Sequence, residues 1–152
     1  MPSRYGKIKI NARLKSVLLA SFILPLELTI FHTILTVVLK PGSDMDFRQL
    51  LTSLRTTLLT LDLSQNIVSP SHLEALCAAF ERGRLAGDSG PPLSDLNLAT
   101  TNVEESHVRR LLASCDNLSS INLSGSRALP RDMKKLYQGD AFLEFKSQML
   151  SL

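Results

Sequence analysis

The chain has 152 residues, a length that allows one domain or part of a repeat array and excludes a two-domain enzyme. Hydrophobic residues make up 44% of the sequence and charged residues 20%, and this composition excludes a chain that is disordered throughout. The net charge is +3, but the first fifteen residues hold five cations and no acid, so the remaining body is net acidic. The basic charge therefore belongs to a short arm, and the body does not have the composition of a nucleic-acid-binding domain.

Residues 1–31 form a region of their own, in which the basic arm is followed by an apolar segment. The apolar run continues to residue 39, and residues 16–39 read SVLLASFILPLELTIFHTILTVVL. Because a membrane-spanning helix needs about 20 apolar residues, one interpretation of this run is a membrane span. Pro25, Glu27 and His32 interrupt the run, and a carboxylate is costly in a bilayer, which favours a buried segment of a soluble fold. A spurious or alternative first exon is the third interpretation.

One spacing of apolar residues recurs through the rest of the chain, and repeats of this length indicate a stacked array. The spacing is LxxLxLxxNxΦ, where Φ is apolar, and its first clear copy consists of Leu58, Leu61, Leu63, Asn66 and Val68. It returns over residues 93–103 and 118–128, with Thr101 and Ser126 in place of the asparagine. Three copies of one spacing predict three structurally equivalent units.

The copies also predict how the chain is divided. A fainter copy starts at Ile34, so the array is expected over residues 32–137. The interval between the first two clear copies is longer than the others, because residues 81–92 add a polar stretch rich in glycine and proline. We interpret residues 81–92 as a loop insertion and residues 138–152 as a tail that follows the array.

Each strand-like register is followed by apolar residues spaced i, i+3, i+4 and i+7, which predicts one amphipathic helix per unit. The three stripes consist of Phe47, Leu50, Leu51 and Leu54, of Leu73, Leu76, Cys77 and Phe80, and of Val108, Leu111, Leu112 and Cys115. Ser69 before Pro70 predicts the start of the middle helix, and Pro130 predicts the start of a last helix that includes Met133 and Leu136. Each unit is therefore expected to be a short strand, a turn and a helix.

This pattern resembles the leucine-rich repeat, in the helix-containing form found in ribonuclease inhibitor. The resemblance rests on agreement at both the strand and the helix positions of three units. It implies an α/β fold of the solenoid type, a short horseshoe arc with parallel strands on the concave face and helices on the convex face.

The segment from about His32 to Tyr137 is also similar to the carboxy-terminal repeat array of tonsoku-like proteins. LTLDLSQN, LSDLNLATTN and LSSINLSGS correspond to three consecutive strand-turn segments of that array. The resemblance implies a nuclear scaffold in the repair of stalled replication forks by homologous recombination, whose array contacts a strand-exchange recombinase. The ankyrin and tetratricopeptide regions of that family are absent from the sequence, so histone reading is not carried over, and the resemblance implies a fragment or an alternative product.

The residues between the leucines of each strand are expected on the concave face, because side chains alternate along a strand. The candidate partner-binding residues are Thr60, Asp62, Ser64, Gln65, Asp95, Asn97, Ser120 and Asn122. Asp62, Asn97 and Asn122 form the expected central column. These side chains are mostly short, polar and slightly acidic, and they offer no aromatic platform for bases. We therefore expect a protein partner and no direct contact with nucleic acid.

The sequence contains no constellation that is typical of catalysis or metal binding. His32, His72 and His107 are far apart, and Cys77 and Cys115 occupy helix-stripe positions, where a thiol acts as a small hydrophobic group. The histidines are interpreted as helix-surface or hydrogen-bonded structural residues. We expect no enzyme activity, no cofactor, no metal and no small-molecule substrate.

Two further features belong to the alternatives. Six cations lie between residues 109 and 135, and most are expected on solvent-facing helix positions, with a phosphate-contacting patch as the alternative: Arg109, Arg110, Arg127, Arg131, Lys134 and Lys135. Asn117 and Asn122 begin glycosylation sequons, which have meaning only in a secretory setting. The expected localisation is nuclear, and the alternative is a membrane protein anchored by residues 16–39 whose repeats bind partners in the lumen or outside the cell.

Overall fold

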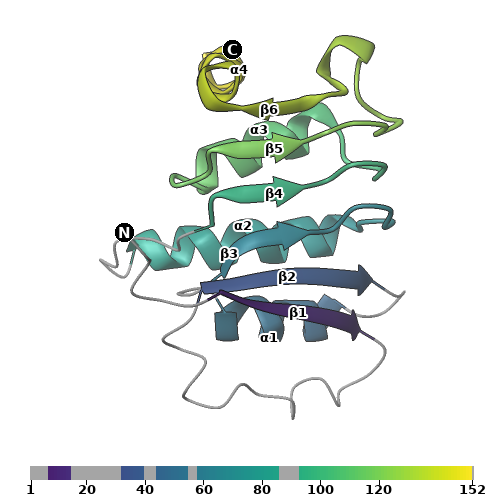
Figure 1. The fold of residues 1–152 in the computed structure, drawn as a ribbon, viewed down its shortest axis with the longest axis vertical. Coiled ribbons are helices and arrows are strands. Elements are labelled where there is room, and N and C mark those ends of the chain that lie inside the picture. Colours follow the sequence, from purple (N-terminus) through teal and green to yellow (C-terminus); the bar gives the residue numbers. More distant parts are fainter. Residues whose placement is uncertain (1–6, 15–31, 40–43, 55–57, 86–92, 152) are drawn as a thin grey trace.

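The computed structural model describes residues 7–14, 32–39, 44–54, 58–85 and 93–151 of the chain (Figure 1). Within these residues the protein is an α/β structure with one six-stranded sheet in the order β1-β2-β3-β4-β5-β6. The strands are β1 (Lys7–Leu14), β2 (His32–Leu39), β3 (Leu58–Asp62), β4 (Asp95–Asn97), β5 (Ser120–Asn122) and β6 (Leu136–Gln138). The helices are α1 (Asp44–Leu54), α2 (Pro70–Leu85), α3 (Glu105–Ser114) and α4 (Gly139–Leu150). Helices α1, α2 and α3 cover one face of the sheet, and α4 lies at its β6 end (Figure 1).

The parallel part of the sheet follows the spacing of the sequence. Strands β1 to β5 are parallel, and β3, β4 and β5 confirm the short strand predicted in each of the three clear copies. Leu61 pairs with Leu96, and Leu96 pairs with Ile121, so the copies are in register at equivalent positions. Helices α2 and α3 follow β3 and β4, as the apolar stripes predict.

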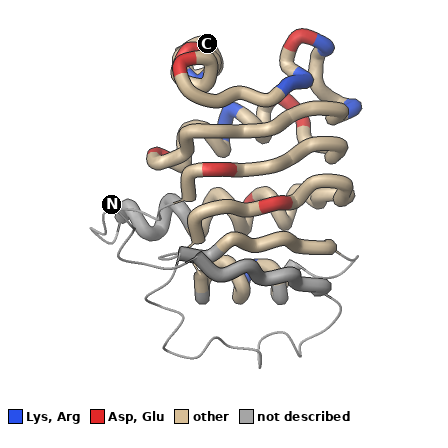
Figure 2. The backbone as a smooth tube through the Cα atoms, viewed as in Figure 1, with Lys and Arg blue, Asp and Glu red and all other residues tan. Residues whose placement is uncertain are grey.

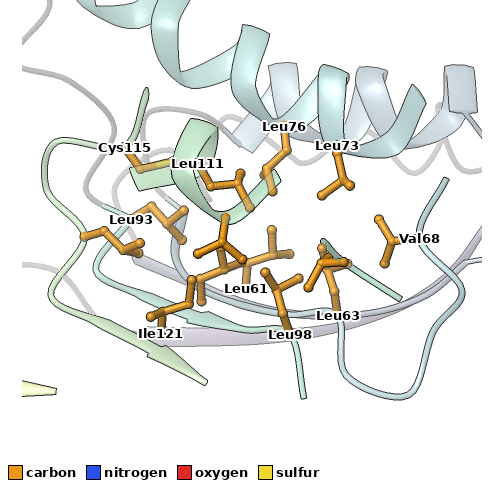
Figure 3. Packing of buried hydrophobic residues seen from close by; sticks show 14 of the residues in the cluster. Leu61, Leu63, Val68, Leu73, Leu76, Leu93, Leu98, Leu111, Cys115 and Ile121 are labelled. Atoms are coloured by element: carbon orange, nitrogen blue, oxygen red, sulfur yellow. The ribbon is translucent and has the colours of Figure 1, made fainter. Parts of the chain in front are cut away.

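The core lies between the sheet and the helices. The apolar residues at the second and third positions of the three clear copies are at most 2% exposed: Leu61, Leu63, Leu96, Leu98, Ile121 and Leu123. Figure 3 shows Leu76 and Leu111 of the helices packed over these strand residues. The helix stripes are buried as predicted, except that Leu50 is only partly buried and the side chain of Phe80 is outside the described residues. A single unit could not bury its leucines without its neighbours.

The turns that follow β3, β4 and β5 repeat one strained backbone conformation. Gln65, Thr100 and Gly125 hold the same place in the three copies, with φ angles of 60°, 56° and 72°. These angles lie in the left-handed region, which favours glycine and is costly for the β-branched Thr100. The stacked turns support one another, because Gln65 N–H donates to the carbonyl of Ala99 at 2.9 Å.

The asparagine position of the pattern is polar and hydrogen-bonded in all three clear copies. Asn66 Nδ2 donates to the carbonyl of Val37 in the preceding strand at 2.9 Å. The buried hydroxyls of Thr101 and Ser126 both donate to the carbonyl of Leu98, at 2.7 and 2.9 Å. The substitutions at this position therefore still satisfy backbone carbonyls that turn away from water.

Two histidines accept backbone N–H groups at the starts of α2 and α3. Ser69 N–H donates to His72 Nδ1 at 3.1 Å, and His72 N–H donates to Ser69 Oγ at 3.1 Å. Glu104 N–H donates to His107 Nδ1, also at 3.1 Å. Both arrangements are capping boxes with histidine at the third helical position. They confirm Ser69 as the start signal of α2 and give both histidines structural partners.

The register predicted for the faintest copy is wrong by two residues. Leu35 pairs with Leu61, so Leu35 and Val37 occupy the buried positions, at 0% and 2% exposure. Ile34 pairs with Thr60 and lies on the opposite face. A slip of two residues keeps each side chain on its face, so Val37 and Leu39, the other members of the faint copy, are buried as expected, at 2% and 9% exposure.

The fourth helix predicted from Pro130 is also wrong. Residues Arg131–Met133 form one turn of 3₁₀-helix, and Leu136 begins β6, which pairs antiparallel with β5. The alternation of exposed Leu136, buried Tyr137 and exposed Gln138 is that of a strand. Residues 138–152, expected as a tail, contain α4, which packs against α3 and β6.

Two further predicted regions are only partly within the described residues. Residues 81–85 of the expected loop insertion belong to α2, and residues 86–92 are outside the description. Of the possible membrane span at residues 16–39, residues 32–39 form β2 and residues 16–31 are outside the described residues. In the described part of the chain, every helix is too short or too polar to cross a bilayer.

Candidate functional site

The candidate site is the face of the sheet that the helices leave uncovered, which we call the polar sheet face. On β3, β4 and β5, it carries Thr60, Asp62, Asp95, Asn97, Ser120 and Asn122. Ser64 and Gln65 of the first turn continue this set beyond β3. All of these side chains are partly or fully exposed, so the face is open to solvent. The sheet therefore brings together the eight residues that the sequence singled out.

The register arranges these residues in columns that cross the strands. Thr60 pairs with Asp95 and Asp95 with Ser120, which forms one column. Because neighbouring strands lie about 4.8 Å apart, side chains within a column are close enough to contact a single partner segment together. The second column consists of Asp62, Asn97 and Asn122.

The second column extends to residues that the sequence did not single out. Thr36 of β2 pairs with Asp62, and Leu136 of β6 pairs with Asn122. Leu136 is 47% exposed and is therefore an apolar side chain at the edge of a polar face. Leu136 lies in this column because β6 pairs antiparallel with β5, and no local signal in the sequence indicated that pairing.

Two carboxylates give the polar sheet face its charge. Figure 2 shows acidic positions on the neighbouring strands β3 and β4, which are Asp62 and Asp95. Asp95 Oδ2 accepts hydrogen bonds from the hydroxyls of Ser94 at 3.0 Å and Thr60 at 3.5 Å. Among the described residues, no cation forms an ion pair with Asp62 or Asp95. Both charges are thus available to a cationic group from outside.

The side chains of the central column also hydrogen-bond to the backbone. Asp62 Oδ1 accepts the N–H of Ser64 at 2.9 Å. Asn97 and Asn122 make the same bond to the residue two positions later, at 3.0 Å each. These side chains hold the start of each turn, so they are not the freely variable surface positions that their exposure suggests.

Two arginines on the helical side, Arg109 and Arg110, lie against acidic residues of α2 and α3. Arg110 forms a bidentate ion pair with Glu74 of the preceding helix, in which Nη2 lies 2.8 Å from Oε1. The hydrogen-bonded guanidinium of Arg110 lowers the pKa of the Glu74 carboxyl below its ordinary value. Arg109 lies 3.6 Å from Glu105 and also donates from Nε to the carbonyl of Met149 at 3.2 Å.

The other four cations do not lie on α-helices, contrary to the prediction. Arg127 and Lys134 lie in loop structure, Arg131 lies in the 3₁₀ turn, and Lys135 directly precedes β6. Their segment connects β5 to β6, where the sequence predicted a helix. Because the helix is not there, these cations do not belong to the solvated helical face.

The buried thiols have the environment of core groups. Cys77 and Cys115 are 2% and 3% exposed, as the helix stripes predict. Burial, together with the nearby Cys77, raises the pKa of the Cys115 thiol far above its ordinary value. That thiol is therefore protonated at neutral pH and is a poor nucleophile.

Comparison with known proteins identifies no relative: no family model, no curated protein and no solved structure matches the chain. The polar sheet face and its charges are accordingly the basis for a functional proposal.

Proposed function

We propose that the chain is a leucine-rich repeat solenoid that acts as a protein-protein interaction scaffold and binds its partner on the polar sheet face. The in-register copies, the equivalent turns and the repeated capping boxes support the solenoid interpretation. In such an array the apolar positions maintain the scaffold and the uncovered strand face contacts the partner.

One observation carries the binding proposal. The polar sheet face presents aligned, small polar side chains around two carboxylates that no cation of the described chain neutralises. A helix-covered sheet of this kind is stabilised by its buried face, so the open face can serve recognition. The polar sheet face offers charge and hydrogen-bonding groups, so the proposal assigns binding to it.

The identity of the partner comes from the resemblance to tonsoku-like proteins. By that resemblance we propose a nuclear role in the repair of stalled replication forks by homologous recombination, with a strand-exchange recombinase as the partner. The partner segment would place a lysine or arginine against Asp62 and Asp95, because a basic side chain is the complement of two unpaired carboxylates.

The test uses substitutions that respect the backbone role of the central column. Changing Asp62, Asn97 and Asn122 to lysine removes three turn hydrogen bonds, each with a net value of about 0.5–1.5 kcal/mol, and would confuse folding with binding. We instead choose Asp62→Asn, Asp95→Asn and Ser120→Arg in one variant. The two amides keep an oxygen acceptor but lose the charge, and the arginine adds bulk to the face.

The full chain and this variant are titrated with a purified strand-exchange recombinase in a direct binding assay. We expect the variant to bind at least about tenfold more weakly, since a lost charge contact and a steric clash together exceed about 1.4 kcal/mol. The matched control on α4 carries Asp140→Asn, Glu144→Gln and Ser147→Arg, which repeats the same chemistry at exposed positions. The control should bind as the unchanged chain does.

The outcomes separate the surface from the partner. If the recombinase binds the unchanged chain and the polar-face variant equally, the polar sheet face is not the binding surface. If it does not bind the unchanged chain, the partner suggested by the resemblance is wrong.

A further inference from the structure

The connection between β5 and β6 contains four cations that are close together in the sequence. Residues 127–135, which we call the basic connector, contain Arg127, Arg131, Lys134 and Lys135, with Asp132 as their one acid. Arg127, Arg131 and Lys135 are exposed, and Lys134 is partly exposed. Figure 2 shows these cations at the end of the sheet where β5 runs into the connector.

The four cations are unpaired within the described residues, in contrast to Arg109 and Arg110. Lys135 Nζ lies 5.5 Å from the centre of the Tyr137 ring, a contact that positions the ammonium without neutralising it. The acids of the neighbouring helix start are already engaged, because Glu104 belongs to the capping box and Glu105 lies near Arg109. The basic connector therefore keeps its positive charge.

The connector is held in place by its own backbone. Leu129 and Met133 are buried and anchor it to the core. Met133 N–H donates to the carbonyl of Pro130 at 2.9 Å, and the Tyr137 hydroxyl donates to the carbonyl of Asp132 at 3.2 Å. A charged loop with a fixed backbone loses little conformational entropy when it binds an anion.

The surroundings of the cations favour phosphate over a protein partner. Within residues 127–135 no large apolar side chain is exposed, and Leu136, which follows directly and is 47% exposed, lies in the column of the polar sheet face. Protein interfaces usually need an apolar or aromatic anchor, whereas contacts with a nucleic-acid backbone are carried by charge. The nearby aromatic residues Tyr137, Phe142 and Phe145 are buried, so none is available to stack on an unpaired base.

We propose that the basic connector binds the phosphate backbone of duplex nucleic acid without reading its bases. A duplex provides the highest density of phosphates, and it requires no stacking platform. This site is separate from the polar sheet face and does not depend on the proposed protein partner. It would allow the scaffold to hold a partner protein close to nucleic acid.

The experiment measures binding of the full chain to a short labelled DNA duplex by fluorescence anisotropy over a range of salt concentrations. Four phosphate contacts predict that the logarithm of the binding constant falls with the logarithm of salt with a slope contribution of about −3.6. The variant with Arg127→Gln, Arg131→Gln, Lys134→Gln and Lys135→Gln should lose this contribution. A milder variant, Arg127→Gln with Arg131→Gln, should lose about half of it.

Two controls isolate the connector. Arg109→Gln with Arg110→Gln removes two cations from the helical side and should leave the salt slope unchanged, because both are already paired. Lys7→Gln, Lys9→Gln and Arg13→Gln in β1 measure any contribution of the amino-terminal cations. Thermal melts of all variants ensure that each is folded.

The proposal is overturned if both connector variants are folded and keep the full salt slope. It is also overturned if a single strand of the same length binds more tightly than the duplex, or if polyglutamate of equal charge competes as well as the duplex does. The last result would identify the connector as a site for an acidic protein. None of these outcomes depends on whether the recombinase binds the polar sheet face.

Discussion

The middle of the molecule and its carboxy-terminal closing segment bury their apolar side chains in different ways. In the middle, from β3 to β5, each strand adds leucines beside those of its neighbour, and the parallel register is continuous. In the closing segment, residues 131–150, the chain reverses and β6 pairs antiparallel with β5. Here aromatic side chains replace leucines: Tyr137 stacks on Phe145 with ring centres 3.9 Å apart.

The difference shows what the edge of the parallel part of the sheet requires. Each strand from β2 to β4 has a parallel neighbour on both sides, whereas β5 would leave its apolar neighbours uncovered at the edge of the parallel part. In this protein Phe142, Phe145 and Met149 of α4 are buried against that end. Large side chains on one short helix cover the area that a further complete unit would otherwise cover.

The largest effect is expected in the closing segment. Phe142 is 1% exposed, and Phe142→Ala should lower the free energy of unfolding by about 3–5 kcal/mol, as for other buried phenylalanines. Urea denaturation followed by circular dichroism measures this change. The matched control is Leu143→Ala on the exposed side of α4, which should change stability by no more than about 0.5 kcal/mol. An equal and small effect of both would mean that α4 is not part of the cooperative core.

A somewhat smaller effect is expected in the middle. Leu96 is 2% exposed at the centre of the sheet, and Leu96→Ala should lower the free energy of unfolding by about 2–5 kcal/mol. Ile67→Ala is the control, since Ile67 is 83% exposed in the same region. If Leu96→Ala leaves the denaturation midpoint unchanged, the stacked leucines do not form the core that the structure describes.

The smallest effects concern the left-handed turns, and they should have opposite signs. Gly125→Ala should destabilise the protein by about 1–2 kcal/mol, because φ is positive and the added Cβ would lie 3.0 Å from Thr100 Oγ1. Gln65→Gly should raise the free energy of unfolding by about 0.5 kcal/mol, because strain relief slightly exceeds the entropic cost of glycine. Thermal denaturation of both variants measures the pair. A stabilising Gly125→Ala would show that the turns are not equivalent.

Much of the parallel fold could be predicted from the sequence because its information is local and repeated. The spacing of Leu58, Leu61 and Leu63 returns twice, and it determines both which side chains are buried and which polar residues share the opposite face. The helix stripes and Ser69 are equally local signals. Even the columns of the polar sheet face follow from equal spacing once parallel stacking is assumed.

The tertiary structure alone determined the features that depend on contacts between segments distant in sequence. Nothing near Leu136 distinguishes a strand from a helix until β5 is available to pair with it, and the location of the basic connector follows from that pairing. The register of β2 was likewise determined by pairing with β3, which aligns Leu35 with Leu61. The backbone role of Asp62, Asn97 and Asn122 appeared only in the folded turns, where a side-chain oxygen meets an N–H two residues later. Periodicity records which side chains are apolar, whereas register, chain reversal and hydrogen-bond partners are determined by the whole sheet.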